Sequence, residues 1–418
     1  MAAWAASGPG ATFNKDVQPI LQRHCQACHR PGEVGPMPLL NYQQARPWAK
    51  SIREAVLLKK MPPWFADPEH GKFSNDARLS QAEIDALVSW ADAGAPEGDR
   101  KDWSKPREFV DGWNIGMPDV VLEMPTEFAV PAGGVIEYQT VILPTGFTED
   151  KWVEALEIRP GNRAVVHHVT ASTRQAGSKW LEGAAPGVPF VRSRAARQAQ
   201  PQTDLDRPEY IVGYTPGRPA SRFAPGQARL IKAGSDIVFS LHYTPTGTAA
   251  TDRTKIGFVF AKAPPQWRAV NMVVVARDLV VPPGAAAHRV EAAVTLQQDA
   301  TLIRMWPHMH VRGKYFEYRA VFPGGESRIL LRVPRYDFNW QLSYNLETPL
   351  LLPKGTRIEG VAYYDNSPNN PSNPDPSAEV RWGDQSWEEM MEGYFDVAID
   401  PRMNPADLRR AKPAPTGN

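Results

Sequence analysis

The stretch at positions 306–313, Trp-Pro-His-Met-His-Val-Arg-Gly, limits the possible folds of this chain more than any other feature. In a β-strand alternate residues point to the same face, so His308 and His310 face the same way. The opposite face carries Met305 and Met309 and is typical of a packed core. Two polar residues on a solvated strand face would show the same spacing. The interpretation we favour is a half-buried sheet that presents half of a metal site.

The other histidines support a metal site. Of the nine histidines in the chain, five fall into one pattern, a His-His pair, a single His and a His-x-His: His167, His168, His242, His308 and His310. Adjacent strand residues point to opposite faces, so one metal can bind both His167 and His168 only at a bend, bulge or strand end. On strand geometry alone, one ligand and one structural histidine is the simpler interpretation. His242 lies on the less apolar face of its predicted strand, which suits a ligand.

Composition excludes several classes of partner. The chain has 418 residues, enough for two to four domains. Its net charge of +1 gives no reason to expect a nucleic acid or an anionic membrane as partner. No apolar run approaches the roughly 20 residues of a membrane span, so we expect none. The 41 prolines favour β-structure and ordered loops over helix bundles.

The chain has two cysteines, in the sequence Cys25-Gln-Ala-Cys28-His29. Cys-x-x-Cys-His is the motif of covalent c-type haem attachment, in which both thiols form thioethers and the histidine binds iron. A thioredoxin-like redox pair would require a βαβ context, whereas the flanks here have helical patterns. Both thiols are then used, and no disulfide is possible. Because haem is attached to such motifs outside the bacterial cytoplasm, we expect a periplasmic or secreted protein.

Residues 12–100 are predicted to form a small all-α domain around this motif. A capping box at Ser80 to Glu83 marks the start of its last helix. This range resembles a class I cytochrome c, which implies one covalent haem c. Either Met37 or Met61 can be the sixth iron ligand, since both can reach by chain length. The segment around Met61 looks like the distal loop of such cytochromes, so we favour Met61.

The rest of the chain is predicted to be β-rich. We expect a disordered start at 1–11, a linker at 101–118, β-domains at 119–263 and 264–410, and a tail at 411–418. A last strand is predicted near residues 388–397. On that strand Met391 falls on the core face, whereas Met390 shares the polar face.

The order His-His, His, His-x-His and Glu-Met resembles the copper type II, ascorbate-dependent monooxygenases, the family of peptidylglycine α-hydroxylating and dopamine β-monooxygenases. The resemblance covers roughly residues 118–400. It implies two jelly-roll-like β-sandwich domains, each with one copper, that face each other across a solvent-filled cleft. It also implies two ligand sets, with oxygen activated at the second: His167, His168 and His242, then His308, His310 and Met390. Thioether sulfur suits copper that cycles through Cu(I).

The chain departs from the peptide-hydroxylating members around the substrate. Where they have an Arg that holds the substrate carboxylate, this sequence has Trp306. Where they have an Asn, two residues after the ligand Met, it has Glu392; Tyr394 is retained. A glutamate beside the site would repel a carboxylate. We therefore expect these three residues to shape a pocket for a neutral or cationic small molecule with an activated C–H bond.

The expected activity is a copper-dependent monooxygenase that hydroxylates this substrate with O2. Electrons from a periplasmic donor would pass through the fused haem to the all-histidine copper and then to the second copper. One alternative is an electron-transfer or copper-binding protein without hydroxylation. Another is a different metal-dependent oxidoreductase.

Overall fold

The structure is a computed structural model, and it describes residues 10–110, 112–193, 195–196, 201–215 and 220–409. The expected tail and all but two residues of the expected start lie outside these ranges. The chain divides into two compact units. Unit 1 comprises residues 1–64 and 76–111, and unit 2 comprises residues 65–75 and 112–418.

Unit 1 contains short helices and no strand among its described residues. They are η1 (Phe13–Val17), α1 (Gln18–His24), α2 (Tyr42–Ala45), η2 (Arg46–Trp48), α3 (Ala49–Leu57), α4 (Gln81–Asp92) and η3 (Arg100–Asp102). Helix α4 begins with the predicted capping box, in which the Ser80 hydroxyl accepts from the Glu83 backbone N–H and the Glu83 carboxylate accepts from the Ser80 N–H. Leu87 and Trp90 of α4 are fully buried, which packs this helix on the rest of the unit.

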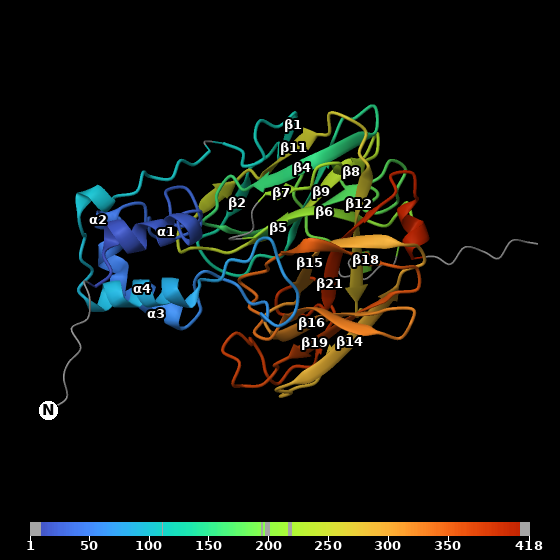
Figure 1. Cartoon of the computed structure of the whole chain (residues 1–418). Helices are drawn as coiled ribbons and strands as arrows, with labels where there is room; N and C mark the ends of the chain where they lie inside the picture. The colour runs from blue at the N-terminus through green and yellow to red at the C-terminus, as the bar shows by residue number, and fades with distance from the viewer. Residues whose placement is uncertain (1–9, 111, 194, 197–200, 216–219, 410–418) are drawn as a thin grey trace, which may run out of the picture. The chain divides into compact units, whose positions relative to one another are not determined.

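Unit 2 is built almost entirely of strands (Figure 1). The strands before residue 263 are β1 (Val120–Glu123), β2 (Phe128–Val130), β3 (Gln139–Pro144), β4 (Lys151–Arg159), β5 (Val166–Arg174), β6 (Glu209–Tyr214), β7 (Ser221–Arg222), β8 (Gln227–Ile231), β9 (Asp236–Tyr243), β10 (Ala250–Asp252) and β11 (Lys255–Phe260). The later elements are β12 (Trp267–Val275), β13 (Val280–Val281), β14 (His288–Thr295), β15 (Ala300–His308), β16 (Gly313–Val321), β17 (Ser327–Val333), β18 (Tyr344–Leu352), β19 (Arg357–Tyr364), β20 (Val380–Arg381), β21 (Glu392–Ile399) and η4 (Pro405–Leu408). The prediction of a mainly β chain is confirmed.

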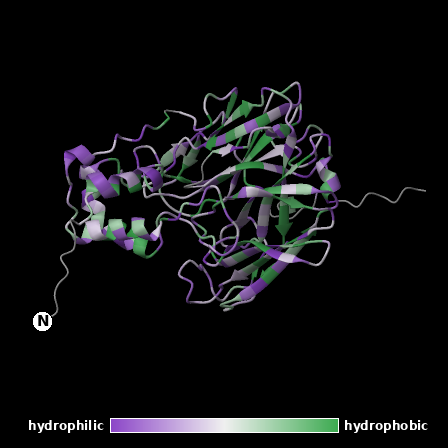
Figure 2. Cartoon of the chain, in the orientation of Figure 1, coloured by the Kyte–Doolittle hydropathy of each residue, from purple (hydrophilic) through white to green (hydrophobic). Residues whose placement is uncertain are grey.

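The sheets of unit 2 are stacked. The longest has the strand order β1-β11-β4-β8-β12-β21-β15-β18, and four-stranded sheets β3-β9-β5-β6 and β14-β19-β16-β17 accompany it. In the first half, one apolar core contains Leu156 and Phe258 from the long sheet and Phe239 and Val169 from β3-β9-β5-β6. This core between two sheets is the arrangement of a β-sandwich. In Figure 2 many of these strands carry both hydrophobic and hydrophilic residues, as strands with unlike faces do.

The long sheet runs through both ranges that the sequence assigns to separate β-domains. The parallel pair β8 and β12 joins the halves, with Trp267 opposite Gln227. The expected boundary near residue 264 therefore falls within one sheet. Backbone hydrogen bonding between distant strands makes this connection, and strand periodicity cannot reveal it.

The segment at residues 65–75 lies within the range predicted for the helical domain, but it belongs to unit 2 and packs on the later strands of that unit. Its backbone bonds there include Ser74 N to Asn345 O, 2.9 Å, and Phe73 packs edge-on against Tyr344. The chain therefore passes from unit 1 to unit 2 and back before the linker. Among the described residues, no helix has the length and apolar character to cross a membrane.

Candidate metal centres

The first histidine cluster forms where β5 begins and β9 ends. His168 pairs directly with His242, and the register shifts between Val166 and His168, so His167 sits at an irregularity of the β5–β9 pairing. Such a shift is what allows adjacent side chains to turn toward one point. The structure thus brings together all three predicted ligands.

The three imidazoles converge closely. Their candidate ligand atoms all lie within 4.8 Å of one another. His167 Nδ1 is 3.3 Å from His242 Nδ1, and the Tyr138 hydroxyl is 2.9 Å from His168 Nε2. The Tyr138 ring stacks on His242, with centroids 4.7 Å apart. Three converging ring nitrogens with an aromatic wall fit a metal that prefers imidazole ligands, such as copper or zinc.

Burial keeps these histidines neutral. It lowers the pKa of His167, lowers that of His242 to about 3 and depresses that of His168 strongly, and the neighbouring imidazoles add to the effect at His168 and His242. A metal ligand must be the neutral imidazole, because the protonated ring has no free lone pair. The cluster is therefore ready to bind a cation over a wide range of pH.

The second cluster is built at the end of β15. The rings of His308 and His310 are 5.2 Å apart, although β15 ends at His308 and His310 lies in the connection that follows, so the predicted shared strand face does not extend to it. His308 Nδ1 donates to Gln341 Oε1 at 2.7 Å, and His310 Nδ1 donates to the Glu388 carbonyl at 3.2 Å. Each Nδ1 therefore carries the proton, and each Nε2 is left as a lone-pair donor.

The two candidate methionines differ in their surroundings. Met391 is fully buried, and Met390 lines the same cavity as His308 and His310. Two imidazoles and a thioether therefore line one cavity. This donor set fits copper in its softer, reduced state.

One cavity of about 530 Å³ is lined by residues of both clusters, among them His168, His308 and Met390. Between the clusters stands Phe338, whose ring centroid is 5.3 Å from that of His167 and 6.0 Å from that of His310. The two candidate centres therefore border one cavity and share one aromatic neighbour.

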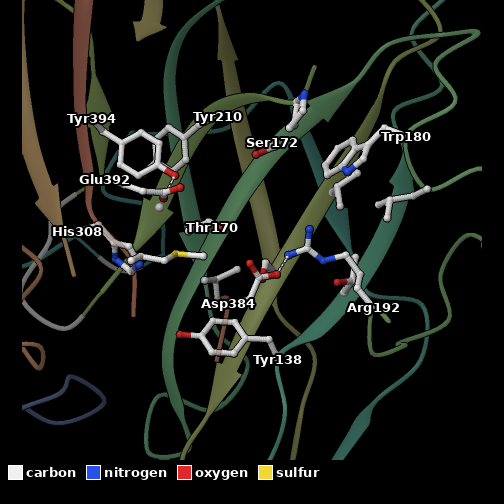
Figure 3. A pocket seen from close by; sticks show the side chains of 18 of the residues that line it. Tyr138, Thr170, Ser172, Trp180, Arg192, Tyr210, His308, Asp384, Glu392 and Tyr394 are labelled. Carbon is white, nitrogen blue, oxygen red and sulfur yellow. Dashed lines mark hydrogen bonds and ion pairs between the residues drawn. The ribbon is translucent and has the colours of Figure 1, made fainter. Parts of the chain in front are cut away.

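Three residues predicted to contact the substrate, Trp306, Glu392 and Tyr394, line the same cavity. Figure 3 shows Glu392 and Tyr394 near His308. Trp306 and Tyr394 stack with their planes 8° apart, and Tyr210 packs against both. The Tyr394 hydroxyl donates to the Glu392 carboxylate at 2.5 Å. Glu392 is opposite His308 in the β15–β21 register, which fixes a carboxylate beside the second cluster.

The sequence interpretation missed residues that position the candidate ligands, namely Gln341, which accepts from His308, and Glu389. Glu389 is fully buried and accepts from the backbone N–H groups of His310, Arg312 and Met390. Burial raises its pKa to about 8, although the three N–H bonds oppose that rise. In the sequence Glu388-Glu389 looks like an ordinary solvated pair, so no local signal distinguishes it.

In unit 1 the haem motif follows α1. The Cys28 N–H donates to the Cys25 carbonyl at 3.1 Å, and His29 Nδ1 donates to the Met37 carbonyl at 3.1 Å. His29 Nε2 is thus left as a lone-pair donor, which fits axial ligation of iron. Burial raises the pKa of the Cys25 thiol to about 12, which is opposite to the lowered pKa of a redox-active Cys-x-x-Cys. Met61 lies half-buried in the loop after α3.

A further acidic and histidine group, Asp67, Glu69 and His70, lies on the segment at 65–75. Asp67 already pairs with Arg332 at 3.5 Å, and Glu69 is exposed. We assign no metal to this group.

No protein-family model and no curated protein matches the chain. Solved structures that are similar to it are viral capsid proteins. The infectious bursal disease virus Gx strain structure has 10% identity over 69% of this chain and 74% of that chain, with a TM-score of 0.19. The major capsid protein P2 from bacteriophage PM2 has 11% identity over 68% of this chain and 98% of that chain, with a TM-score of 0.28. Similarity at this level carries no functional argument.

Proposed function

We propose that this protein is a copper-dependent monooxygenase that hydroxylates a C–H bond of a small molecule with O2. The observation that carries the proposal is one cavity lined by His308, His310 and Met390 and reached by His168 of the all-histidine cluster. A structural zinc site would be closed by four protein ligands, whereas His308, His310 and Met390 all line the cavity and leave room for a further ligand.

The protein's own groups have defined roles in this proposal. His167, His168 and His242 would hold one copper, and His308, His310 and Met390 the other. When bound, copper would supply electron storage at the first site and oxygen activation at the second. The overall reaction is R–H + O2 + two electrons + two protons giving R–OH and water. The cavity walls would hold the substrate and exclude bulk water.

The substrate we propose is neutral or cationic. Glu392 places a carboxylate next to His308, and the Trp306, Tyr210 and Tyr394 rings form an aromatic wall beside it. An anionic substrate would meet repulsion there, whereas an amine can pair with the carboxylate and lie against aromatic faces. Glu392→Gln should then weaken binding of cationic substrates selectively.

We propose further that unit 1 is a class I-like cytochrome c that serves as the internal electron donor. Cys25 and Cys28 would bind the haem covalently, with His29 and Met61 as iron ligands. The linker at 101–118 would keep the haem at an effective concentration of roughly millimolar relative to the coppers. Because such haems are attached outside the bacterial cytoplasm, the protein would act in the periplasm or be secreted.

The test is oxygen consumption by the pre-reduced, copper-loaded protein with panels of cationic, neutral and anionic small molecules. The proposal expects substrate-dependent O2 uptake and a product heavier by one oxygen atom, which derives from labelled O2. Copper binding without O2 uptake by any substrate would favour an electron-transfer or copper-storage protein. O2 uptake that requires iron or another metal instead of copper would favour a different oxidoreductase.

A further inference from the structure

We propose that Glu389 is a positioning residue that joins the two segments supplying His310 and Met390 into one preformed copper clamp. This inference rests on the proposed function, because it assigns a role at the second copper site. Glu389 itself would not bind the metal.

The carboxylate of Glu389 contacts both ligand segments. Its Oε2 accepts from His310 N at 2.8 Å and from Met390 N at 3.2 Å, while its Oε1 accepts from Arg312 N at 2.7 Å. Glu389 and His310 are 79 positions apart in the chain, so a single side chain links two distant stretches of backbone. The side chain is 0% exposed, and water does not compete for these bonds.

Neighbouring side chains hold the same backbone from other directions. The Tyr364 hydroxyl donates to the Met390 carbonyl at 2.8 Å. The Tyr336 hydroxyl accepts from Met309 N and donates to Met309 O, at 3.0 and 2.8 Å. Arg312, only 1% exposed, donates to the Trp387 carbonyl at 2.9 Å. The segments before and after each ligand are therefore fixed independently of any metal.

Such a clamp has a direct energetic effect on metal binding. A methionine side chain is long and flexible, so ordering it around a metal costs entropy that a fixed backbone reduces. A glutamine at this position has one oxygen acceptor and an NH2 group that cannot accept. It cannot satisfy backbone N–H groups on both sides, and an unsatisfied buried N–H costs about 1–3 kcal/mol.

The experiment is a Cu(I) titration of the full chain against a competing chelator, combined with X-ray absorption to detect the copper–sulfur bond. Glu389→Gln should weaken the second site by roughly 10- to 100-fold and reduce the copper–sulfur signal. The all-histidine site should keep its affinity and so report that unit 2 is folded. Tyr364→Phe should weaken the same site to a smaller extent. Glu379→Gln is the matched control, because this exposed glutamate pairs with the exposed Arg381.

The outcomes separate this inference from the proposed function. A wild-type chain that binds copper only at the all-histidine site would overturn both. A wild-type chain with two sites, together with Glu389→Gln that keeps both affinities and the copper–sulfur signal, would overturn the clamp alone. Should Glu389→Gln fail to fold, an unchanged second site in Tyr364→Phe would overturn the clamp.

Discussion

The two histidine clusters of unit 2 are assembled by different means. In the first, pairing of β5 with β9 and one register shift aim the rings at one another, and His167 and His242 touch directly. In the second, His308 and His310 do not rely on each other, since a separate oxygen acceptor holds each Nδ1. The first centre is thus a product of strand pairing, whereas the second is assembled from a strand end and a distant loop. We expect the second to be the more sensitive to changes outside its ligands.

The largest effect should come from the buried ion pairs that fix β21 against β15. Asp396 is fully buried and pairs with Arg229 at 3.0 Å and with Arg304 across the register that carries the second centre. Asp396→Asn removes the carboxylate that pairs with Arg304 and the nearer of the two carboxylates that pair with Arg229, and should lower the free energy of unfolding by about 3–5 kcal/mol. The measurement is denaturant unfolding. The control is Asp400→Asn, whose exposed pair with Arg402 should have no measurable effect; equal losses in the two variants would refute the argument.

The next largest effect should distinguish Met390, which lines the cavity, from Met391, which is buried in the core. Met390→Ile removes the thioether at the cavity and should lower substrate-dependent O2 uptake by roughly 100-fold or more, about 2.7 kcal/mol of activation free energy. The first cluster should keep its copper. Met391→Ile changes a core residue of similar volume and should keep activity, with a stability loss below about 1.5 kcal/mol. Loss of activity in Met391→Ile alone would show that the two side chains have been assigned to the wrong faces.

His242→Ala tests whether the first cluster delivers electrons. Anaerobically reduced haem, mixed with O2 and substrate in a stopped-flow instrument, should be reoxidised at least roughly tenfold more slowly in this variant, equivalent to about 1.4 kcal/mol. His288→Ala on β14, outside both clusters, serves as the control. Haem reoxidation that is indifferent to His242→Ala would contradict the proposed electron order.

The last prediction is a pH dependence of stability that arises at the first cluster. In metal-free protein His242 stays neutral down to a pKa of about 3, whereas the unfolded chain takes up a proton near pH 6.5. The folded-state pKa is the lower one, so stability is full above pH 6.5 and falls as pH drops toward 3. The slope for this group is at most about 1.4 kcal/mol for each pH unit. His242→Gln should flatten the unfolding free energy between pH 6.5 and 4; an unchanged slope would argue against this assignment.

Local patterns in the sequence predicted the ligands better than the groups that hold them. The predicted pairing of His308 with His310 and the separation of Met390 from Met391 agree with their positions, but the strands stop short of them: β15 ends at His308, and β21 begins at Glu392 instead of near residue 388. At His167-His168 strand alternation left two interpretations open, a shared metal at a bend, bulge or strand end, or one ligand and one structural histidine; the register shift between Val166 and His168 comes from the structure. The partners came from elsewhere: Gln341 and Phe338 lie in the loop between β17 and β18, and Glu389 sits in an unremarkable acidic run. Their roles depend on contacts between residues far apart in the chain, which periodicity does not encode.

The same limit applies to the course of the chain. The capping box at Ser80 predicted the start of α4, because that signal is contained within four residues. The packing of residues 65–75 on unit 2, and the sheet that runs from β1 to β18, both depend on hydrogen bonds between distant strands and loops. Neither has a local sequence signal.

The most direct test of the account is metal analysis of the full chain, produced with haem attachment and saturated with copper. We predict one covalently bound haem iron and two coppers per chain, with His242→Ala and Met390→Ile each weakening a different copper. One copper or none at saturation, or iron beyond the haem, would contradict the assignment of both clusters as copper centres.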